Sequence, residues 1–232
     1  RDRFLAEPVR LVHDKDISKE AINMVKKILG VGTNDSLIPG GRYHHRRDYM
    51  NFPQLNRSDL QYERKEALPI NGLSLEKSIF KAIKQKDYLI YTPYHSFSFV
   101  IKFLREAALD PEVTIIKITI YRLSRLSNVA SSLINAAKNG KKVLVQIELQ
   151  ARFDETNNII YAEQMQAAGV ELIFGIPGLK VHSKICVIEK STQGKKRRYG
   201  FISTGNFNED TAKVYTDYTL FTSNQKVLKE VN

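Results

Sequence analysis

The sequence predicts an α/β fold, in which a mixed parallel and antiparallel sheet is covered by helices. Helical and strand patterns alternate from residue 73 onward, which is typical of parallel strands joined by crossover helices. After Gly178 the pattern changes to strands in succession, which indicates antiparallel pairing. Hydrophobic residues make up 42% of the 232 residues, enough for a globular core.

The first part of the chain differs from the rest. Apolar positions at helical spacing predict a helix over 17–29, ended by Gly30. Residues 31–72 are basic, aromatic and rich in turn residues, which indicates a domain boundary or a functional surface, with a solvated linker as the alternative. We therefore expect two domains. We expect residues 1–68 to form one domain, partial and helical, with its connection, and residues 69–232 to form the α/β domain.

The second domain is predicted element by element. We expect helices over 74–86, 97–108, 128–139 and 157–168, and strands over 87–92, 113–120, 142–149 and 170–174. Strands over 181–189, 198–204 and 216–222 follow, with a turn at Gln193-Gly194. These three strands resemble an antiparallel edge added to the sheet. Active sites on such sheets lie in loops at strand ends, which here begin at Tyr121, Gln150 and Gly205.

A histidine and a lysine stand two residues apart, at His182 and Lys184. Side chains alternate along a strand, so both are expected to lie on the same face. The turn at residues 203–206, Ser-Thr-Gly-Asn, can bring backbone N–H groups and the Asn206 amide to the same place. This combination suits attack of a histidine nitrogen on phosphorus, with cationic and amide donors on the phosphoryl oxygens. A merely exposed or hydrogen-bonded strand histidine is the alternative.

Two arginines follow consecutive strands, Arg122 after 113–120 and Arg152 after 142–149. A guanidinium holds two phosphate oxygens at once and keeps its charge near neutral pH. The alternative is that each arginine pairs with a carboxylate, such as Asp154 for Arg152. Their matching positions favour phosphate binding.

The net charge of +11 and the pI of about 9.6 indicate an anionic partner. There is no Trp and no recognised nucleic-acid motif, so we expect no nucleic-acid partner. The single cysteine, Cys186, excludes a disulfide within the chain and favours a reducing compartment. No run of eighteen apolar residues exists, so we expect no transmembrane segment. We expect a cytoplasmic protein, and its association with a membrane surface stays open.

Part of this pattern resembles phospholipase D enzymes. The residues that carry the resemblance are His182, Lys184, Glu189 and the turn ending at Asn206, with Glu in place of the usual Asp. Such enzymes need two histidine half-sites, and this sequence contains one. A phosphodiesterase or nuclease that works as a dimer of half-sites is therefore the alternative function.

A longer series of motifs resembles the polyphosphate kinase family of the first, phospholipase-D-related type. The motifs come in the expected order and span almost the whole chain: 38–44, 52–53, 119–122, 148–158, 178–184, 204–208 and 215–217. The resemblance implies an ATP:polyphosphate phosphotransferase that works reversibly on ATP or ADP and inorganic polyphosphate. It implies an internal fragment, in which 1–68 are the C-terminal part of a preceding domain and 69–232 are the first of two catalytic domains. The final domain, which carries a second histidine, would be absent, so we expect weak or no activity from the fragment alone. We expect the full-length protein to be a homo-oligomer.

The resemblance also assigns roles to residues. It implies a phosphohistidine at His182, magnesium or phosphate binding at Arg122 and Arg152, and a nucleotide contact at Tyr215, for which half-buried packing is the alternative. A guanidinium has no lone pair for a cation, so we expect these arginines to hold Mg²⁺, the implied cofactor of ATP, only through phosphate. Lys184 and Asn206 are expected to stabilise phosphoryl charge. Residues 42–47 guide polyphosphate or pack against a missing domain, and 195–198 form a solvated basic hairpin tip or part of a non-catalytic polyanion-binding surface.

Overall fold

The computed structural model describes most of the chain, namely residues 8–33, 35–43, 49, 52–53, 55–63, 65–148, 155–175, 178 and 182–232, without the side chains of 155–157. Its contacts divide the chain into two compact units, residues 1–64 and 65–232. In the described part, no helix is long and apolar enough to cross a membrane.

The first unit contains one helix between two short strands. Helix α1 (Lys19–Leu29) begins after Ser18, whose hydroxyl accepts the Ala21 N–H, and ends at Gly30, which has φ of 68°. Strands β1 (Arg10–Asp14) and β2 (Ser36–Gly40) pair in parallel. The expected helix is present, but the two strands were not predicted. Both are only five residues long, and β2 contains Pro39 and Gly40, which are depleted in strands.

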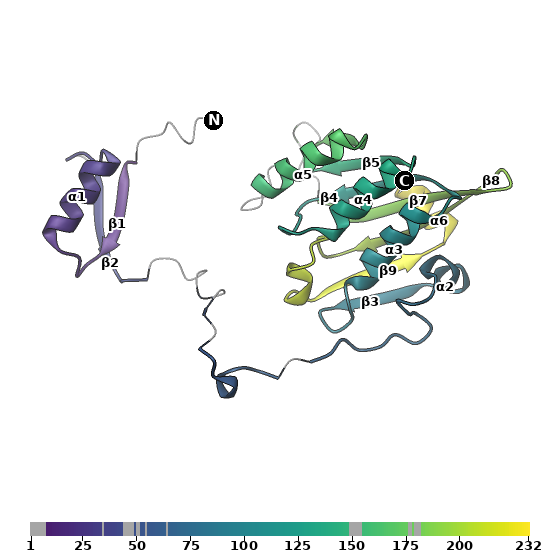
Figure 1. The fold of residues 1–232 in the computed structure, drawn as a ribbon, viewed down its shortest axis with the longest axis horizontal. Helices are drawn as coiled ribbons and strands as arrows, with labels where there is room; N and C mark the ends of the chain where they lie inside the picture. The colour runs from purple at the N-terminus through teal and green to yellow at the C-terminus, as the bar shows by residue number, and fades with distance from the viewer. Residues whose placement is uncertain are drawn as a thin grey trace. The chain divides into compact units, whose positions relative to one another are not determined.

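The second unit contains a seven-stranded mixed sheet in the order β3-β9-β8-β7-β4-β5-β6 (Figure 1). Its strands are β3 (Tyr88–Thr92), β4 (Val113–Ile120), β5 (Lys142–Ile147), β6 (Glu171–Phe174), β7 (Ile185–Thr192), β8 (Lys195–Ser203) and β9 (Asp217–Thr222). Strands β4, β5 and β6 are parallel, and the other neighbours are antiparallel. The predicted mixed sheet is confirmed.

The position predicted for the late strands is wrong. Strands β7, β8 and β9 do not extend an edge, because they lie between β3 and β4 in the middle of the sheet. The order of strands along the chain carries no signal for this insertion, because strand order depends on contacts between distant residues. Their central position matters for the site, because it places the loops beside β7 and β8 next to the loop that follows β4.

The helices of the second unit are α2 (Ile79–Gln85), α3 (Ser98–Leu109), α4 (Asn128–Lys138), α5 (Glu155–Ala167) and α6 (Gln225–Glu230), with single 3₁₀ turns at Thr211–Lys213 and, in the first unit, Ser58–Leu60. Neighbouring helices from α2 to α5 pack against one another. Helix α2 begins five residues later than predicted, because Ser78 caps it by accepting the Lys81 N–H.

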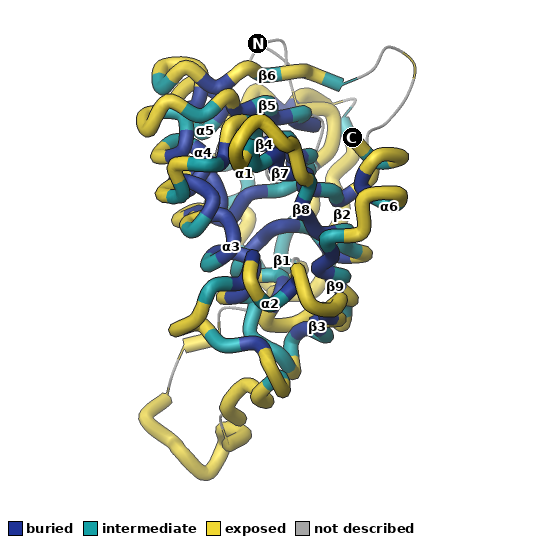
Figure 2. Tube along the Cα trace, turned by 90° about the vertical axis from the view of Figure 1, so that its right-hand side faces the viewer, coloured by how far each residue is buried: buried dark blue, intermediate teal, exposed yellow. Residues whose placement is uncertain are grey.

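The core lies between this helix layer and the sheet. Figure 2 shows the most buried trace along the central strands and on the helices beside them. Alternate residues of β4, Ile116, Ile118 and Ile120, are buried as the period of a strand requires. Aromatic rings fill the space between α3 and the strands, where Phe103 lies 5.8 Å from Phe201 and 5.6 Å from Phe221 between ring centroids.

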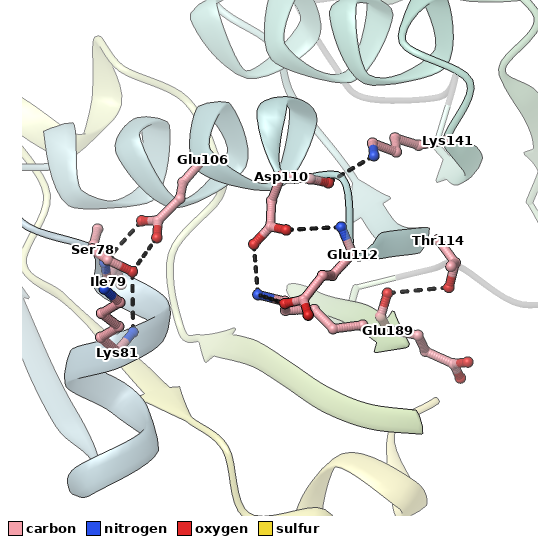
Figure 3. A network of polar contacts seen from close by, with 10 residues as sticks. Ser78, Ile79, Lys81, Glu106, Asp110, Glu112, Thr114, Lys141 and Glu189 are labelled. Atoms are coloured by element: carbon pink, nitrogen blue, oxygen red, sulfur yellow. Dashed lines mark hydrogen bonds and ion pairs between the residues drawn. The ribbon is translucent and has the colours of Figure 1, made fainter. Parts of the chain in front are cut away.

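An ion-pair network lies at the end of the sheet where β4 begins and β7 ends (Figure 3). The Lys190 ammonium lies 2.6 Å from Asp110 Oδ2 and 3.1 Å from Glu112 Oε2. Asp110 also accepts the Glu112 N–H through Oδ1 and the Lys141 ammonium through its backbone oxygen. These contacts join the α3–β4 connection to β7.

Candidate active site

Two of the three loops predicted to hold the site, those that begin at Tyr121 and Gly205, lie at the same end of the strands, called the site edge here, whereas Gln150 lies outside the described residues. Strands β4 and β8 end there, and β7 and β9 begin there, because β7 is antiparallel to both β4 and β8 and β9 is antiparallel to β8. Backbone bonds join the loops: the Ser203 N–H donates to Lys184 O at 2.8 Å, and the Thr204 N–H donates to Tyr218 O at 3.0 Å. The Lys190 network lies at the other end of the same strands.

His182 and Lys184 lie at this edge, but not on a strand. Strand β7 begins at Ile185, four residues after the predicted start, so strand alternation does not place the two side chains. His182 is exposed, whereas Lys184 is buried and its ammonium donates to the His182 backbone oxygen at 2.6 Å. The predicted placement of His182 and Lys184 on a strand is therefore wrong, because β7 begins only at Ile185.

Tyr121, the first residue after β4, brings the two side chains together instead. The His182 ring lies edge-on to the Tyr121 ring, with centroids 5.5 Å apart and planes at 78°. The Lys184 ammonium lies 5.5 Å from the same ring centroid, and the Arg122 guanidinium lies 5.7 Å from it. A nucleophilic imidazole and two cations therefore surround one aromatic ring.

The electrostatic environment of Lys184 suits an anion. Burial lowers the pKa of the Lys184 ammonium, and the positive charge of Arg122 lowers it further, against the opposing effect of Asp217. The lowered pKa means that the surroundings do not fully compensate this charge. A phosphate bound here would supply the missing negative charge.

Asn206 stands in the turn that follows β8, at the end of the strands where the site lies. The Oδ1 atom of Asn206 is buried and has no hydrogen-bond partner among the described residues. The Gly205 N–H, which we expected to serve a ligand, donates to Ser203 Oγ at 3.1 Å. The turn therefore offers the Asn206 side chain, while the Gly205 N–H holds the turn itself.

Asp217, the first residue of β9, lies against this turn. Its Oδ1 accepts the Thr204 hydroxyl at 2.7 Å. A side chain at position 205 would overlap the Asp217 carboxylate, so only glycine allows this close approach. Neither Asp217 nor Tyr121 was assigned a role from the sequence, although both stand within motifs that carried the family resemblance.

The remaining predicted residues fall into three groups. Arg152 and Asp154 lie outside the described residues, although Glu148, which follows β5, is at the same edge and donates its N–H to Ile120 O. Tyr215 is 62% exposed, which argues against the packing alternative and leaves its ring free for a ligand. Glu189 does not belong to the site, because it is buried within β7 and pairs with Arg198 at 3.1 Å.

One of the basic segments that the sequence singled out lies at the opposite end of β7 and β8, and the other belongs to the first unit. Residues 195–197 are exposed next to the turn at Gln193-Gly194, where both φ angles are positive. Arg42 pairs with Asp14 at 3.0 Å within the first unit, and residues 44–48 are not among those described.

The described residues do not form a site for a directly ligated metal. No group of three or more His, Cys, Asp or Glu side chains in the described part of the chain could hold an ion. The groups at the edge are mainly cations, which repel Mg²⁺, and an arginine has no lone pair for it. The donor set therefore fits Mg²⁺ only as part of a phosphate substrate that carries the ion.

Comparison with known proteins agrees with this geometry. The family model described as polyphosphate kinase C-terminal domain 1 matches residues 78–232. The chain is 45% identical over 231 residues to a polyphosphate kinase from Yersinia pestis and 43% identical over 236 residues to one from Escherichia coli K12, covering all of this chain and 34% of each relative. The chain thus spans about a third of the length of these relatives.

A solved structure gives the same result. The crystal structure of polyphosphate kinase from Porphyromonas gingivalis superimposes with a TM-score of 0.70 at 35% identity, over 98% of this chain and 36% of that one. The family model covers well over half of the chain, and the site edge lies within the matched residues. The chain belongs to the polyphosphate kinase family.

Proposed function

We propose that this protein transfers the γ-phosphate of ATP reversibly to the end of a polyphosphate chain through a phosphohistidine at His182. The observation that carries the proposal is the cluster around Tyr121, where an exposed imidazole lies beside the Lys184 ammonium and the Arg122 guanidinium. Only the imidazole among these groups is a nucleophile near neutral pH, and the cations suit a highly charged phosphate.

The reaction has two in-line transfers. In the first, a ring nitrogen of neutral His182 forms a bond to the γ-phosphorus, and the bond from that phosphorus to the β,γ-bridging oxygen breaks. ADP leaves with the electron pair. In the second, a terminal oxygen of polyphosphate attacks the phosphohistidine, the N–P bond breaks, and the imidazole returns to its neutral form. Run backwards with ADP as the acceptor, the same steps make ATP.

The surrounding groups act mainly through position and charge. Phosphoryl transfer needs stabilisation of the equatorial oxygens more than covalent chemistry from the protein. Lys184 and Arg122 supply positive charge, and Asn206 supplies an amide. Arg152 is proposed to add a second guanidinium from the segment after β5, and Tyr215 to contact the nucleotide with its exposed ring or hydroxyl.

Mg²⁺ is proposed to enter with ATP, held by phosphate oxygens. It would lower the charge that the transferred group presents to its acceptor. The chain's own residues bind the phosphates that carry the ion and do not ligate it. The excess of positive charge at the edge favours ATP and polyphosphate over a singly charged diester.

A pulse and chase on the full-length protein tests the proposal. The protein is incubated with γ-labelled ATP, separated from nucleotide and then mixed with unlabelled polyphosphate or ADP. We expect the label to enter the wild-type protein and move to either acceptor, whereas His182→Ala takes up none. Equal labelling of both proteins would overturn the proposal. Hydrolysis of a phosphodiester without ATP, lost in His182→Ala, would establish the phosphodiesterase alternative instead.

A further inference from the structure

The loop after β4 carries Arg122 and is held by side chains from other elements. We propose that Asn158 is a positioning residue, whose buried amide fixes the backbone on both sides of Arg122 and so directs the guanidinium toward phosphate. The inference rests on the proposed function, in which Arg122 binds the transferred group.

Asn158 lies in the first turns of α5, and its side chain has no exposed surface. Its Oδ1 accepts the Leu123 N–H at 3.2 Å, and its Nδ2 donates to Tyr121 O at 3.0 Å. These two partners stand directly before and after Arg122. The amide therefore replaces the ladder partners that the backbone loses where β4 ends.

The same amide reaches a second loop. Nδ2 also donates to Glu148 O at 3.1 Å, and Glu148 is the last described residue before the segment that contains Arg152. One side chain thus ties together the starts of the two segments in which the sequence places arginines. A single donor group contacts the carbonyls of both loops, so neither loop can shift alone without breaking a buried hydrogen bond.

Only an amide satisfies all of these partners. The backbone around the Asn158 side chain presents one N–H, which needs an acceptor, and two carbonyls, which need donors. An ionised carboxylate offers acceptors alone, and an aliphatic side chain offers neither. Buried polar groups without partners are costly, so the loop backbone would move if the amide were removed.

Tyr161 provides a matched control in the same helix and loop. Its hydroxyl accepts the Ser127 N–H at 2.8 Å and donates to Arg125 O at 3.1 Å. It therefore makes the same kind of side-chain-to-backbone contact, but beyond Arg122. Glu209 contacts the end of this loop, where α4 begins, and its carboxylate accepts the Asn128 N–H at 2.6 Å. The contacts of Asn158 are the ones that flank Arg122.

The test is a double-mutant cycle in the full-length protein, with kcat and KM for ATP as readouts. Asn158→Ala is expected to lower kcat about 10- to 100-fold, since small displacements of a binding group have effects of that size. Tyr161→Phe is expected to change kcat less than about threefold. In the Arg122→Ala background, Asn158→Ala should lower kcat by a clearly smaller factor than in the wild-type background, because one of the groups that it positions is gone.

A second variant keeps the test decisive if Asn158→Ala folds poorly. Asn158→Asp has nearly the same shape, and its protonated carboxyl regains one donor while keeping an acceptor. Its activity relative to wild type should therefore rise as the pH is lowered. A ratio that stays flat or falls would contradict positioning by hydrogen bonds.

The outcomes separate the two proposals. If Arg122→Ala retains full kcat, the phosphate role of Arg122 is wrong and the positioning role of Asn158 is overturned with it. If Arg122→Ala is impaired but Asn158→Ala lowers kcat equally in both backgrounds, the proposed function stands and the inference on Asn158 fails. An equal loss in Tyr161→Phe would also overturn it, since general loop order would then explain the effect.

Discussion

Two lysines near the two ends of β7 have opposite environments. Lys190 lies between the Asp110 and Glu112 carboxylates. Burial alone would lower the pKa of the Lys190 ammonium, but its hydrogen bonds to these carboxylates raise the pKa overall. Lys184 lies at the other end, donates to a backbone oxygen, and has a pKa lowered first by burial and then by Arg122.

This difference in compensation separates a buried cation that stabilises the fold from one that is suited to bind an anionic ligand. A buried charge that carboxylates compensate stabilises a connection, and its removal leaves those carboxylates without a cation between them. A buried cation whose pKa stays lowered despite a nearby carboxylate, here Asp217, is less fully compensated, and such groups concentrate at functional sites. Lys190 belongs to the first class and Lys184 to the second.

The largest effect is expected at Lys184. Lys184→Ala should lower kcat about 10²- to 10³-fold, since it removes one donor to the transition-state charge. The folded protein should be about as stable as wild type, because a poorly compensated charge is lost. Steady-state kinetics and thermal unfolding on the same preparations check both parts, and a large drop in stability with normal kcat would reverse the comparison.

Lys190→Ala should give the opposite result. We expect unfolding to become easier by about 1–2 kcal/mol, because Asp110 and Glu112 then repel each other without a cation between them. The kcat of the folded protein should not change. Denaturant titration measures the first quantity, and kinetics well below the unfolding temperature measure the second.

The pH dependence sharpens the comparison. Because its pKa is lowered, Lys184 loses its proton at a lower pH than an ordinary lysine, so kcat/KM should fall as the pH rises through that pKa. Bound phosphate raises the pKa again, which places the fall in kcat at higher pH. Lys184→Arg should remove this limb, because a guanidinium keeps its charge, so at alkaline pH its kcat/KM should stay closer to its own maximum than that of wild type does. Identical limbs in both proteins would assign the titration to another group.

The smallest effect is expected far from the site, at the start of α2. The Ser78 hydroxyl accepts the Lys81 N–H at 3.2 Å and donates to Glu106, whose other oxygen accepts the Ile79 N–H at 2.8 Å (Figure 3). Ser78→Ala should cost about 1 kcal/mol of stability, as the loss of an N-cap does. Its kcat should match wild type, and a kinetic defect would show that this end of the sheet affects the site.

Much of the fold could be predicted because it depends on local periodicity. Strand β4 occupies the predicted residues, and α4 begins where predicted. The start of α2 was misplaced because Leu73 and Leu75 continue the apolar spacing before the Ser78 cap, although Leu75 is 43% exposed. The central place of β7 was missed because strand order depends on contacts between distant residues.

The sequence singled out residues of the candidate site, but not how the fold holds them together. Motifs identified His182, Lys184, Arg122 and Asn206, and the structure brings the first three around Tyr121. No local pattern could reveal this ring as their common contact, because it lies 61 residues before His182 in the sequence.

The chemical position of the phosphoryl group during turnover tests the central claim most directly. The full-length protein would be quenched in alkali at millisecond intervals after mixing with ATP and digested, and its phosphopeptides would be sequenced by mass spectrometry. The account predicts phosphate on the His182 imidazole, which forms and disappears at least as fast as kcat. Phosphate on another residue, or a His182 adduct that turns over more slowly than the reaction, would contradict it.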